Sequence, residues 1–180
     1  MSDFVLLGVS GSLRAQATNR KLLREAARLF GPCTYDEADL RLPLYDGDAE
    51  ASDGIPSEVQ VLADQIAAAD AVILSTPEYN KGPSGVLKNA LDWVSRTDGS
   101  PWMGKPVAVM SSAAGRAGGE QAQAVLRGFM VPFQPRLVSG PQVHLAGAAS
   151  QFDDNGQLIS AQYTATLTRL MQILRDDATG

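Results

Sequence analysis

Short apolar runs alternate with amphipathic stretches along this sequence, and this alternation constrains the fold more than any other feature. Five runs have the length and composition of buried strands: 4–9, 34–38, 71–75, 105–110 and 136–139. Between and after them, apolar residues recur at helical spacing, which predicts helices over 19–30, from Ser57 onward, over 86–94 and 118–130, and around 167–174. This βαβαβαβαβα order predicts an α/β fold with a parallel sheet and helices on both faces.

The remaining stretches are connections. Residues 39–56 are rich in Asp, Pro and Gly and are expected to form a loop. No repeat, low-complexity tract or linker divides the chain, so we expect residues 1–180 to form one domain. Open parallel sheets bind ligands beyond the carboxyl ends of their strands, where the strand order reverses. The loops after the first, third and fourth strands are therefore the places where we expect a site.

Charge and composition exclude several classes of protein. The net charge is −5 and no basic patch is visible, so we expect no nucleic-acid partner. No apolar run is long enough to span a bilayer and no signal-peptide pattern is visible, so we expect a cytoplasmic protein that does not bind membranes. The single cysteine, Cys33, belongs to no metal-binding motif, and we expect it to be a buried thiol.

The first of the three loops, residues 10–19, joins a buried strand to a helix N-terminus. That position offers unpaired backbone N–H groups and the positive end of a helix dipole. Arg14 adds a permanent charge and a fork of donors suited to a phosphate. A phosphate monoester fits this loop best. The alternative is a plain strand-to-helix connection in which Thr18 or Asn19 caps the helix.

The same loop also comes close to the GxSxG motif of serine hydrolases. Residues 8–12 are GVSGS, and Ser12 stands where the motif requires its final glycine. A hydrolase would also need His144, the only histidine, as its base. The apolar neighbours of His144 predict a packing role instead, so hydrolysis remains a distant alternative.

The other two loops are built for close backbone contact. Residues 76–85 contain two prolines and two glycines, which fix an unusual backbone path. Its exposed N–H and C=O groups can bond the polar edge of a heteroaromatic ring, against which Tyr79 can pack. Residues 111–119 are small, so a flat ligand can approach their backbone. Each loop alone is equally compatible with a simple connection, but three such loops, each after a predicted strand, favour a shared site.

Three stretches resemble the NAD(P)H-dependent FMN reductases, a family that includes bacterial quinone, azo-dye and chromate reductases. The stretches are GSLRAQATNRKL (11–22), PEYNKGPSGVLKNALDWVSR (77–96) and GRAGGEQAQAVLR (115–127). The second is long and specific, and the order and spacing of all three match the family over almost the whole chain. The resemblance implies a flavodoxin-like, doubly wound, five-stranded parallel sheet.

The resemblance also implies a set of cofactor-binding residues. The FMN phosphate would be surrounded by Ser12, Arg14, Thr18 and Asn19. The isoalloxazine ring would contact Pro77, Glu78, Tyr79 and Asn80, largely through their backbone. The ribityl chain or the ring would be bordered by Ser111, Ser112 and Gly115. No side chain is required as a catalytic nucleophile or base, and no metal is implied.

The activity that follows is electron transfer from NADPH or NADH through FMN to small acceptors such as quinones, azo compounds, metal oxyanions or free flavin, by a ping-pong mechanism. The family usually forms homodimers, often paired as homotetramers, and the helix that bears Trp93 is an expected interface element. The alternatives are a non-enzymatic flavodoxin-like electron carrier and a regulatory protein that has kept the fold.

The chain departs from the family pattern in two places. Ala17 stands where a serine is common, which bears on FMN affinity and favours the regulatory alternative unless Thr18 supplies the hydroxyl. Glu120 and Gln121 stand where an arginine is frequent, which leaves the choice between NADPH and NADH open.

Overall fold

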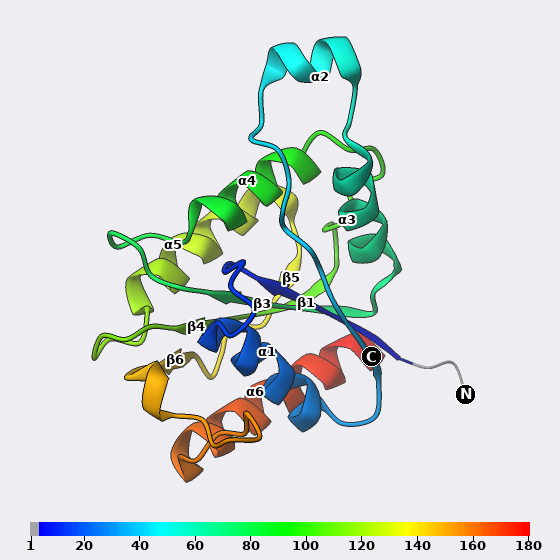
Figure 1. The fold of residues 1–180 in the computed structure, drawn as a ribbon. Coiled ribbons are helices and arrows are strands. Elements are labelled where there is room, and N and C mark those ends of the chain that lie inside the picture. Colours follow the sequence, from blue (N-terminus) through cyan, green and yellow to red (C-terminus); the bar gives the residue numbers. More distant parts are fainter. Residues whose placement is uncertain (1–3) are drawn as a thin grey trace.

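The computed structural model describes residues 4–180, and its centre is a parallel β-sheet. The strands run in the order β2–β1–β3–β4–β5, with β6 also beside β4, and every pairing is parallel (Figure 1). The strands are β1 (Val5–Ser10), β2 (Thr34–Glu37), β3 (Ala71–Thr76), β4 (Pro106–Ser112), β5 (Arg136–Leu137) and β6 (Val143–Leu145). This 2-1-3-4-5 order is that of a flavodoxin-like doubly wound sheet, and the order reverses between β1 and β3. The expected fold class is confirmed.

The fifth position of the sheet is filled by two short segments instead of one strand. Arg136 and Leu137 pair with the start of β4, and the three residues of β6 pair with its end. The sequence predicted a single strand over 136–139. Pro141 lies between the two segments and has no N–H to give to a ladder, so continuous pairing is interrupted there.

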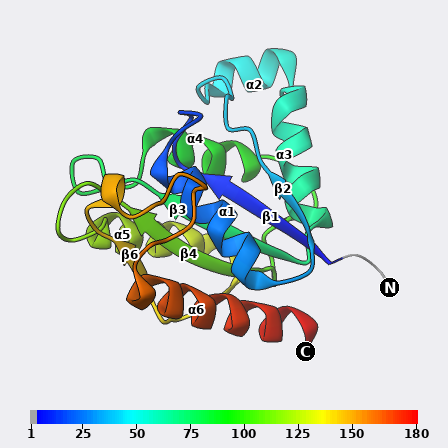
Figure 2. The same cartoon turned by 60° about the horizontal axis from the view of Figure 1, so that its bottom comes forward.

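Helices cover both faces of the sheet (Figures 1 and 2). One face carries α1 (Thr18–Phe30) and α6 (Ala161–Thr179), and the other carries α3 (Ser57–Ala68), α4 (Gly85–Val94) and α5 (Glu120–Met130). The predicted helix over 118–130 begins at Glu120 because Gly118 and Gly119 both have positive φ.

Two apolar clusters, one on each face, hold these layers together. On one face Leu22 and Phe30 of α1 pack with Leu170 of α6, and on the other Ile66 of α3 packs with Leu87 of α4. Every residue of β3 is buried, as expected for a central parallel strand covered on both sides. The buried strands fix the position of the loops that leave their carboxyl ends.

One helix was not expected. The segment 39–56, predicted as a loop, contains α2 (Gly47–Asp53), which stands away from the sheet (Figure 1). None of its residues is buried, so it has no apolar stripe from which it could be predicted. Its local signal is the side chain of Asp46, which accepts a hydrogen bond from the N–H of Asp48 at 2.9 Å and caps the helix.

Cys33 is half-buried rather than buried, which corrects the expectation for this thiol. It lies at the edge of the α1–α6 cluster, and partial burial raises its pKa. Within residues 4–180, no helix has the length and apolar character needed to cross a membrane. The same part of the chain holds no group of three or more His, Cys, Asp or Glu side chains placed to share a metal ion.

Candidate cofactor-binding site

The three loops singled out from the sequence meet at one cleft, beyond the carboxyl ends of β1, β3 and β4. Its volume is about 500 Å³, within the range of small-molecule sites. It is lined by Ser12, Arg14, Gln16, Ala17, Thr18, Asn19, Lys21, Pro77, Glu78, Tyr79, Ser112, Ala113, Ala114, Ala148 and Ala149. Of the residues predicted for the site, Asn80, Ser111 and Gly115 are not among its lining.

The N-terminus of α1 opens into this cleft without a side-chain cap. Ala17 is the N-cap residue, and no side chain of residues 4–180 caps the helix. The C=O of Ala17 accepts hydrogen bonds from the N–H groups of Arg20 and Lys21, at 3.0 and 3.1 Å. The preceding N–H groups, of Thr18 and Asn19, are first-turn donors with no intrahelical acceptor. This arrangement leaves donors and a positive dipole end facing the cleft, as an anion requires.

Arg14 lies exposed beside these donors. It takes part in none of the ion pairs formed within residues 4–180. Lys21 adds a second positive charge from the next turn of α1, with its ammonium 5.8 Å from the ring centroid of Phe152. Two cations beside uncapped N–H groups favour a phosphate over a neutral ligand.

The side chain of Asn19 is used inside the protein. It is 3% exposed. Its amide donates to the C=O of Ser112 at 3.0 Å, and its oxygen accepts from the hydroxyl of Ser75 at 2.7 Å. Asn19 therefore ties α1 to the ends of β3 and β4. Its side chain is committed to these two bonds, whereas its backbone N–H remains available to a ligand.

The first and second loops are fastened to each other below the cleft. The N–H of Gly11 donates to the C=O of Ser75 at 2.8 Å, and the hydroxyl of Ser84 donates to the C=O of Gly11 at 2.6 Å. Ser84 also caps α4, accepting from the N–H of Leu87 at 3.3 Å. A Cβ at Gly11 would lie 2.9 Å from Cδ of Pro77, so this close approach requires glycine.

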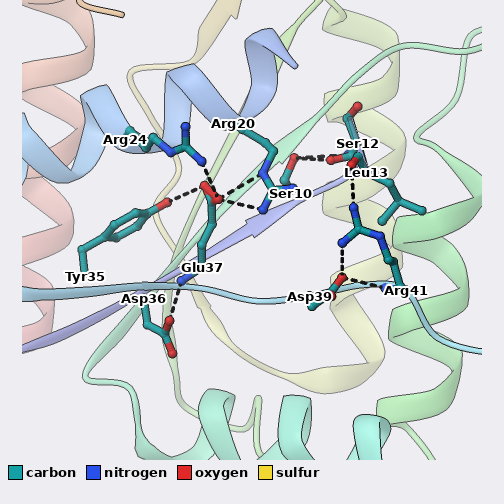
Figure 3. Close-up of polar contacts among 10 residues, drawn as sticks. All are labelled: Ser10, Ser12, Leu13, Arg20, Arg24, Tyr35, Asp36, Glu37, Asp39 and Arg41. Atoms are coloured by element: carbon teal, nitrogen blue, oxygen red, sulfur yellow. Dashed lines mark hydrogen bonds and ion pairs between the residues drawn. The ribbon is translucent and has the colours of Figure 1, made fainter. Parts of the chain in front are cut away.

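Polar contacts also support the first loop from the β2 side (Figure 3). Arg41 donates to the C=O of Leu13 at 3.1 Å, and the N–H of Ser12 donates to the hydroxyl of Ser10 at 3.2 Å. Figure 3 also shows Arg20 pointing to Glu37, with 2.9 Å between their charged atoms. Arg20 lies in the first turn of α1, near the cleft, but its charge is paired with Glu37 of β2.

The second loop forms a tight hairpin at its tip. Tyr79 and Gly82 exchange two backbone hydrogen bonds of 3.0 Å. The two residues between them have positive φ, 50° at Asn80 and 66° at Lys81, as in a type I′ turn. Asn80 therefore serves the turn and lies outside the cleft lining. Tyr79, 57% exposed, presents its ring at the cleft wall.

Glu78 connects the second loop to helix α5. Its carboxylate accepts from the N–H of Ala122 in the first turn of α5 at 3.1 Å, and Lys81 lies 3.5 Å away. The N-cap residue of α5 is Gly119, which has no side chain to do this. Glu78 thus lines the cleft while its carboxylate is directed at a helix N-terminus.

The third loop lines the cleft through one of its three expected residues, Ser112, and through two others. Ala113 and Ala114 border it, together with Ser112, whereas Gly115 does not. Ser111 is fully buried and its hydroxyl accepts from the side-chain amide of Gln123 at 3.3 Å. Ser111 and Gly115 therefore shape the loop without reaching the cleft.

Seven lining residues were not predicted for the site. Four of them belong to the loops singled out from the sequence (Gln16, Ala17, Ala113 and Ala114), and three lie outside those loops. Lys21 lies three residues after Thr18, on the same face of α1, so helical spacing was a usable signal. Ala148 and Ala149 come from a short 3₁₀ segment, Ala148–Ser150, held by a 3.2 Å hydrogen bond from the N–H of Ala148 to the C=O of Ala113. No motif marks that segment, because only the tertiary fold brings it to the cleft.

The hydrolase alternative finds no support in the geometry. The hydroxyl of Ser10 is bonded to the backbone of Ser12, and Nε2 of His144 lies 2.9 Å from the side-chain oxygen of Gln142. His144 is half-buried in β6, and burial lowers its pKa. Ser10 and His144 share no hydrogen bond among the described residues.

The fold and the cleft define a class: a flavodoxin-like α/β protein with an uncapped helix N-terminus beside its strand switch point. Residues 5–150 match the NADPH-dependent FMN reductase family. The chain is 39% identical over 175 residues to an NAD(P)H-dependent FMN reductase of Pseudomonas aeruginosa, covering 96% of this chain and 94% of that one. It is 40% identical to a quinone reductase of Pseudomonas putida, over 83% and 82% of the two chains.

A solved structure agrees with these relatives. The flavoenzyme NAD(P)H:(acceptor) oxidoreductase FerB of Paracoccus denitrificans superposes with a TM-score of 0.87 at 30% identity, covering 98% of this chain and 97% of that one. The chain belongs to the NADPH-dependent FMN reductase family and is an oxidoreductase of the quinone reductase type. Its cofactor is FMN and its electron donor is NAD(P)H. The uncapped α1 N-terminus with Arg14, and the small residues around the cleft, fit a phosphorylated planar cofactor.

Proposed function

We propose that this protein passes electrons from NADPH or NADH to small acceptors by a ping-pong cycle, in which donor and acceptor occupy the same part of the cleft in turn. The observation that carries the proposal is a single cleft at the strand switch point, open to solvent beside Tyr79, which is 57% exposed. FMN, when bound, supplies the hydride and electron chemistry. The chain positions the cofactor and leaves one face of the cleft accessible.

The proposed binding roles follow from where each group lies. Ser12, Arg14, Thr18 and the N–H of Asn19 would hold the phosphate, because they surround the uncapped N-terminus of α1. The backbone of Pro77–Tyr79 would contact the ring and Ser112 the ribityl chain. Asn80, Ser111 and Gly115 would act by shaping the second and third loops.

Acceptor choice is proposed to be broad. The cleft wall beside the ring site is formed by Pro77, Tyr79, Ala113 and Ala114, which offer flat apolar contact and few fixed hydrogen-bond partners. Such a wall discriminates weakly between planar molecules of similar size. Quinones are the first class to test, since a relative at 40% identity is a quinone reductase. Azo compounds, metal oxyanions and free flavin complete the proposed range.

An anaerobic absorbance titration tests the proposal. Protein mixed with FMN is desalted, given NADPH or NADH without acceptor, and then given a quinone. The reductase proposal expects the flavin bands to elute with the protein, bleach on reduction and return with the quinone. Retained flavin that neither donor bleaches would identify an electron carrier. Loss of all flavin would favour the regulatory alternative.

A variant pair links that result to the cleft. Arg14→Ala removes a cleft cation and is expected to weaken FMN binding about tenfold or more, the scale of one hydrogen bond to a charged group. Arg169→Ala, on the exposed side of α6, removes the same charge away from the cleft and serves as the control. Equal affinity of the two variants would contradict the phosphate assignment.

We further propose that the protein is a homodimer, or a tetramer built from dimers. A groove of about 360 Å³ beside the cleft is lined mainly by apolar residues of the first loop, the 40–44 segment and α4: Leu13, Leu40, Arg41, Leu42, Pro43, Leu44, Gly85, Val86 and Asn89. Leu44 is 83% exposed and belongs to this contiguous apolar lining, and contiguous exposed apolar surface is typical of interaction sites. Trp93 is not available to a partner, because it is 2% exposed and its indole N–H donates to the C=O of Pro43 at 2.8 Å.

Light scattering after gel filtration tests this assembly. Leu44→Asp is expected to shift the mass toward that of a monomer, whereas Ile159→Asp, which changes a 63% exposed apolar residue outside the groove, is expected to leave it unchanged. An unchanged mass for Leu44→Asp would place the interface elsewhere.

A further inference from the structure

We propose that a groove at the amino end of β4 binds a small neutral aromatic molecule that carries a carbonyl oxygen, and that the indole N–H of Trp102 donates to that oxygen. The groove has a volume of about 210 Å³. None of the described residues that line it also lines the cofactor cleft, which lies beyond the carboxyl ends of the strands. The groove is therefore a second site, separate from that of FMN.

Two short connections form the walls of the groove. One wall is the turn 100–103, which precedes β4 and is closed by a backbone hydrogen bond of 2.9 Å between its end residues. The other wall comes from residues 132–133 of the 3₁₀ segment Val131–Phe133, which follows α5. The N–H of Gly104 donates to the C=O of Gln134 at 3.0 Å and joins the two connections. The fold thus fixes the separation of the walls, which lowers the ordering cost of binding a ligand.

The walls of the groove are mainly apolar and aromatic. The rings of Trp102 and Phe133 meet edge to face, with centroids 6.5 Å apart and an angle of 62° between their planes. Pro101 and Pro132 add rigid apolar surface, and Met103, which is 61% exposed, lies at the rim. Apolar cavities of about 150 Å³ accommodate benzene in other proteins. A groove of about 210 Å³ therefore has room for one aromatic ring with a small substituent.

Trp102 holds a buried donor that has no acceptor. The residue is 2% exposed, and its indole N–H makes no hydrogen bond within residues 4–180. Its ring also packs in the apolar cluster between the sheet and helices α3, α4 and α5, so the groove is the side from which an acceptor can approach. The indole of Trp93 differs, because it donates to the C=O of Pro43 at 2.8 Å. Since an unpaired buried donor is destabilising, a carbonyl oxygen in the groove gains affinity by pairing it.

Electrostatics favours a neutral ligand over an anion. None of the described residues that line the groove is charged. Helix α4 ends at Val94, which lines the groove, and α5 ends at Met130, directly before the 3₁₀ wall. The C-terminal ends of helices carry partial negative charge, which disfavours a carboxylate. Aromatic ketones and quinones combine a neutral ring with the acceptor that Trp102 lacks.

Nitrogen-15 labelling of tryptophan in the FMN-loaded protein tests the proposal by NMR. The chain has two tryptophans, so the two indole N–H resonances are assigned with Trp102→Phe. Acetophenone is the probe, and α-methylstyrene, which has a CH₂ group in place of the oxygen, is the matched ligand. Acetophenone is expected to shift the Trp102 resonance saturably, with a dissociation constant of about 1 mM. The Trp93 resonance is expected to stay unchanged, because that N–H is already bonded.

The oxygen and the charge of the ligand are tested separately. α-Methylstyrene is expected to bind about tenfold more weakly than acetophenone, the scale of one hydrogen bond to a buried donor. Benzoate is also expected to bind more weakly than acetophenone, because it is an anion. In Trp102→Phe, followed by broadening of the ligand signals, the two neutral ligands are expected to bind alike. Equal affinities of these ligands for the wild type would overturn the role of the indole N–H.

A pair of surface variants tests the location without changing the core. Met103→Ala shortens an exposed lining side chain and is expected to weaken acetophenone about threefold through lost apolar contact. Val131→Ala changes a 68% exposed apolar side chain beside the groove that is not part of its lining, and is expected to bind like the wild type. Equal weakening by both variants would place the ligand elsewhere.

Two further outcomes would overturn the proposal. Acetophenone that shifts neither indole resonance, or both alike, would show that it does not bind at Trp102. A Trp102 resonance that shifts with protein concentration in the absence of ligand would show that a second copy of the chain covers the groove instead of a small molecule.

Discussion

The carboxylate of Glu78 lies 3.1 Å from the backbone nitrogen of Ala122, so a residue that follows β3 caps the helix that follows β4. The helix needs an external cap because its own N-cap residue is Gly119. A Cβ at Gly119 would lie 2.9 Å from that of Ser111, so the glycine is required by close packing. Gly119 therefore allows the close packing of the third loop against Ser111, and its lack of a side chain leaves the cap of α5 to Glu78.

Removing this cap should loosen both loops. Glu78→Ala is expected to lower the free energy of unfolding by about 1 kcal/mol, the usual cost of a lost N-cap. Glu78→Gln keeps an acceptor oxygen but loses the charge, so we expect a smaller loss. Urea denaturation followed by circular dichroism measures both. Asp154→Ala, in an exposed turn, is the control, and a Glu78→Ala protein as stable as that control would show that the contact contributes nothing.

Substitutions at Gly118 and Gly99 distinguish the stability cost of a left-handed backbone from the cost of a steric clash. Both have positive φ, 60° and 83°, but a Cβ would lie 2.3 Å from the C=O oxygen of His144 at Gly118 and would meet nothing within 4 Å at Gly99. Gly99→Ala should cost about 1–2 kcal/mol of stability from the left-handed backbone alone. Gly118→Ala should cost about 1–3 kcal/mol more, because backbone atoms must move. Thermal denaturation compares the two, and equal losses would contradict the close approach of Gly118 to β6.

The sheet and its large helices could be predicted because their signals are local. The apolar run AVILS predicts β3, which is buried along its whole length. The helical spacing of apolar residues predicts α1, which buries that apolar face. The helix α2 and the division of the last strand could not be predicted in this way. The helix buries nothing, and the pairing of residues 143–145 with β4 depends on contacts distant in sequence.

The candidate site was predictable only as far as its loops. Ser12, Arg14, Thr18 and residues 77–79 line the cleft, because each follows a strand whose carboxyl end was identifiable. The roles of Asn19 and Glu78 were not predictable, since their partners, Ser112 at the end of β4 and Ala122 in α5, are distant in sequence. A sequence motif predicts which residues lie near a ligand. It does not predict where each side chain points, because that depends on neighbours that are distant in sequence.

Gly8 in β1 gives a test of packing against β2. A Cβ at this position would lie 2.3 Å from the hydroxyl oxygen of Tyr35 and 2.8 Å from its ring. Gly8→Ala is therefore expected to destabilise the protein by about 1–3 kcal/mol. Tyr35→Leu in the same chain should relieve part of that cost, so that the double variant is more stable than the sum of the single losses predicts. Strict additivity in urea denaturation would show that Tyr35 is not the residue that excludes a side chain at Gly8.

His144 should make stability depend on pH in a defined direction. Its folded-state pKa is lowered from the ordinary value of 6.5, first by burial and also by Arg127, while Glu120 opposes the shift. The unfolded chain therefore binds a proton on His144 at a pH where the folded chain does not. The contribution of His144 to stability is fully present above about pH 6.5 and is lost as the pH falls toward the lower folded value.

His144→Gln removes the titrating group and keeps a side chain able to bond Gln142. The difference in unfolding free energy between wild type and His144→Gln is measured by urea denaturation from about pH 8 to pH 5, so that other titrating groups cancel. As the pH decreases below about 6.5, the wild type should lose unfolding free energy relative to His144→Gln. The loss is expected to reach up to about 1.4 kcal/mol for each unit by which the pKa is lowered, and to be smaller because solvent screens the half-buried ring. A difference independent of pH would mean that His144 titrates alike in the folded and unfolded chains, and that its packing in β6 does not desolvate the ring.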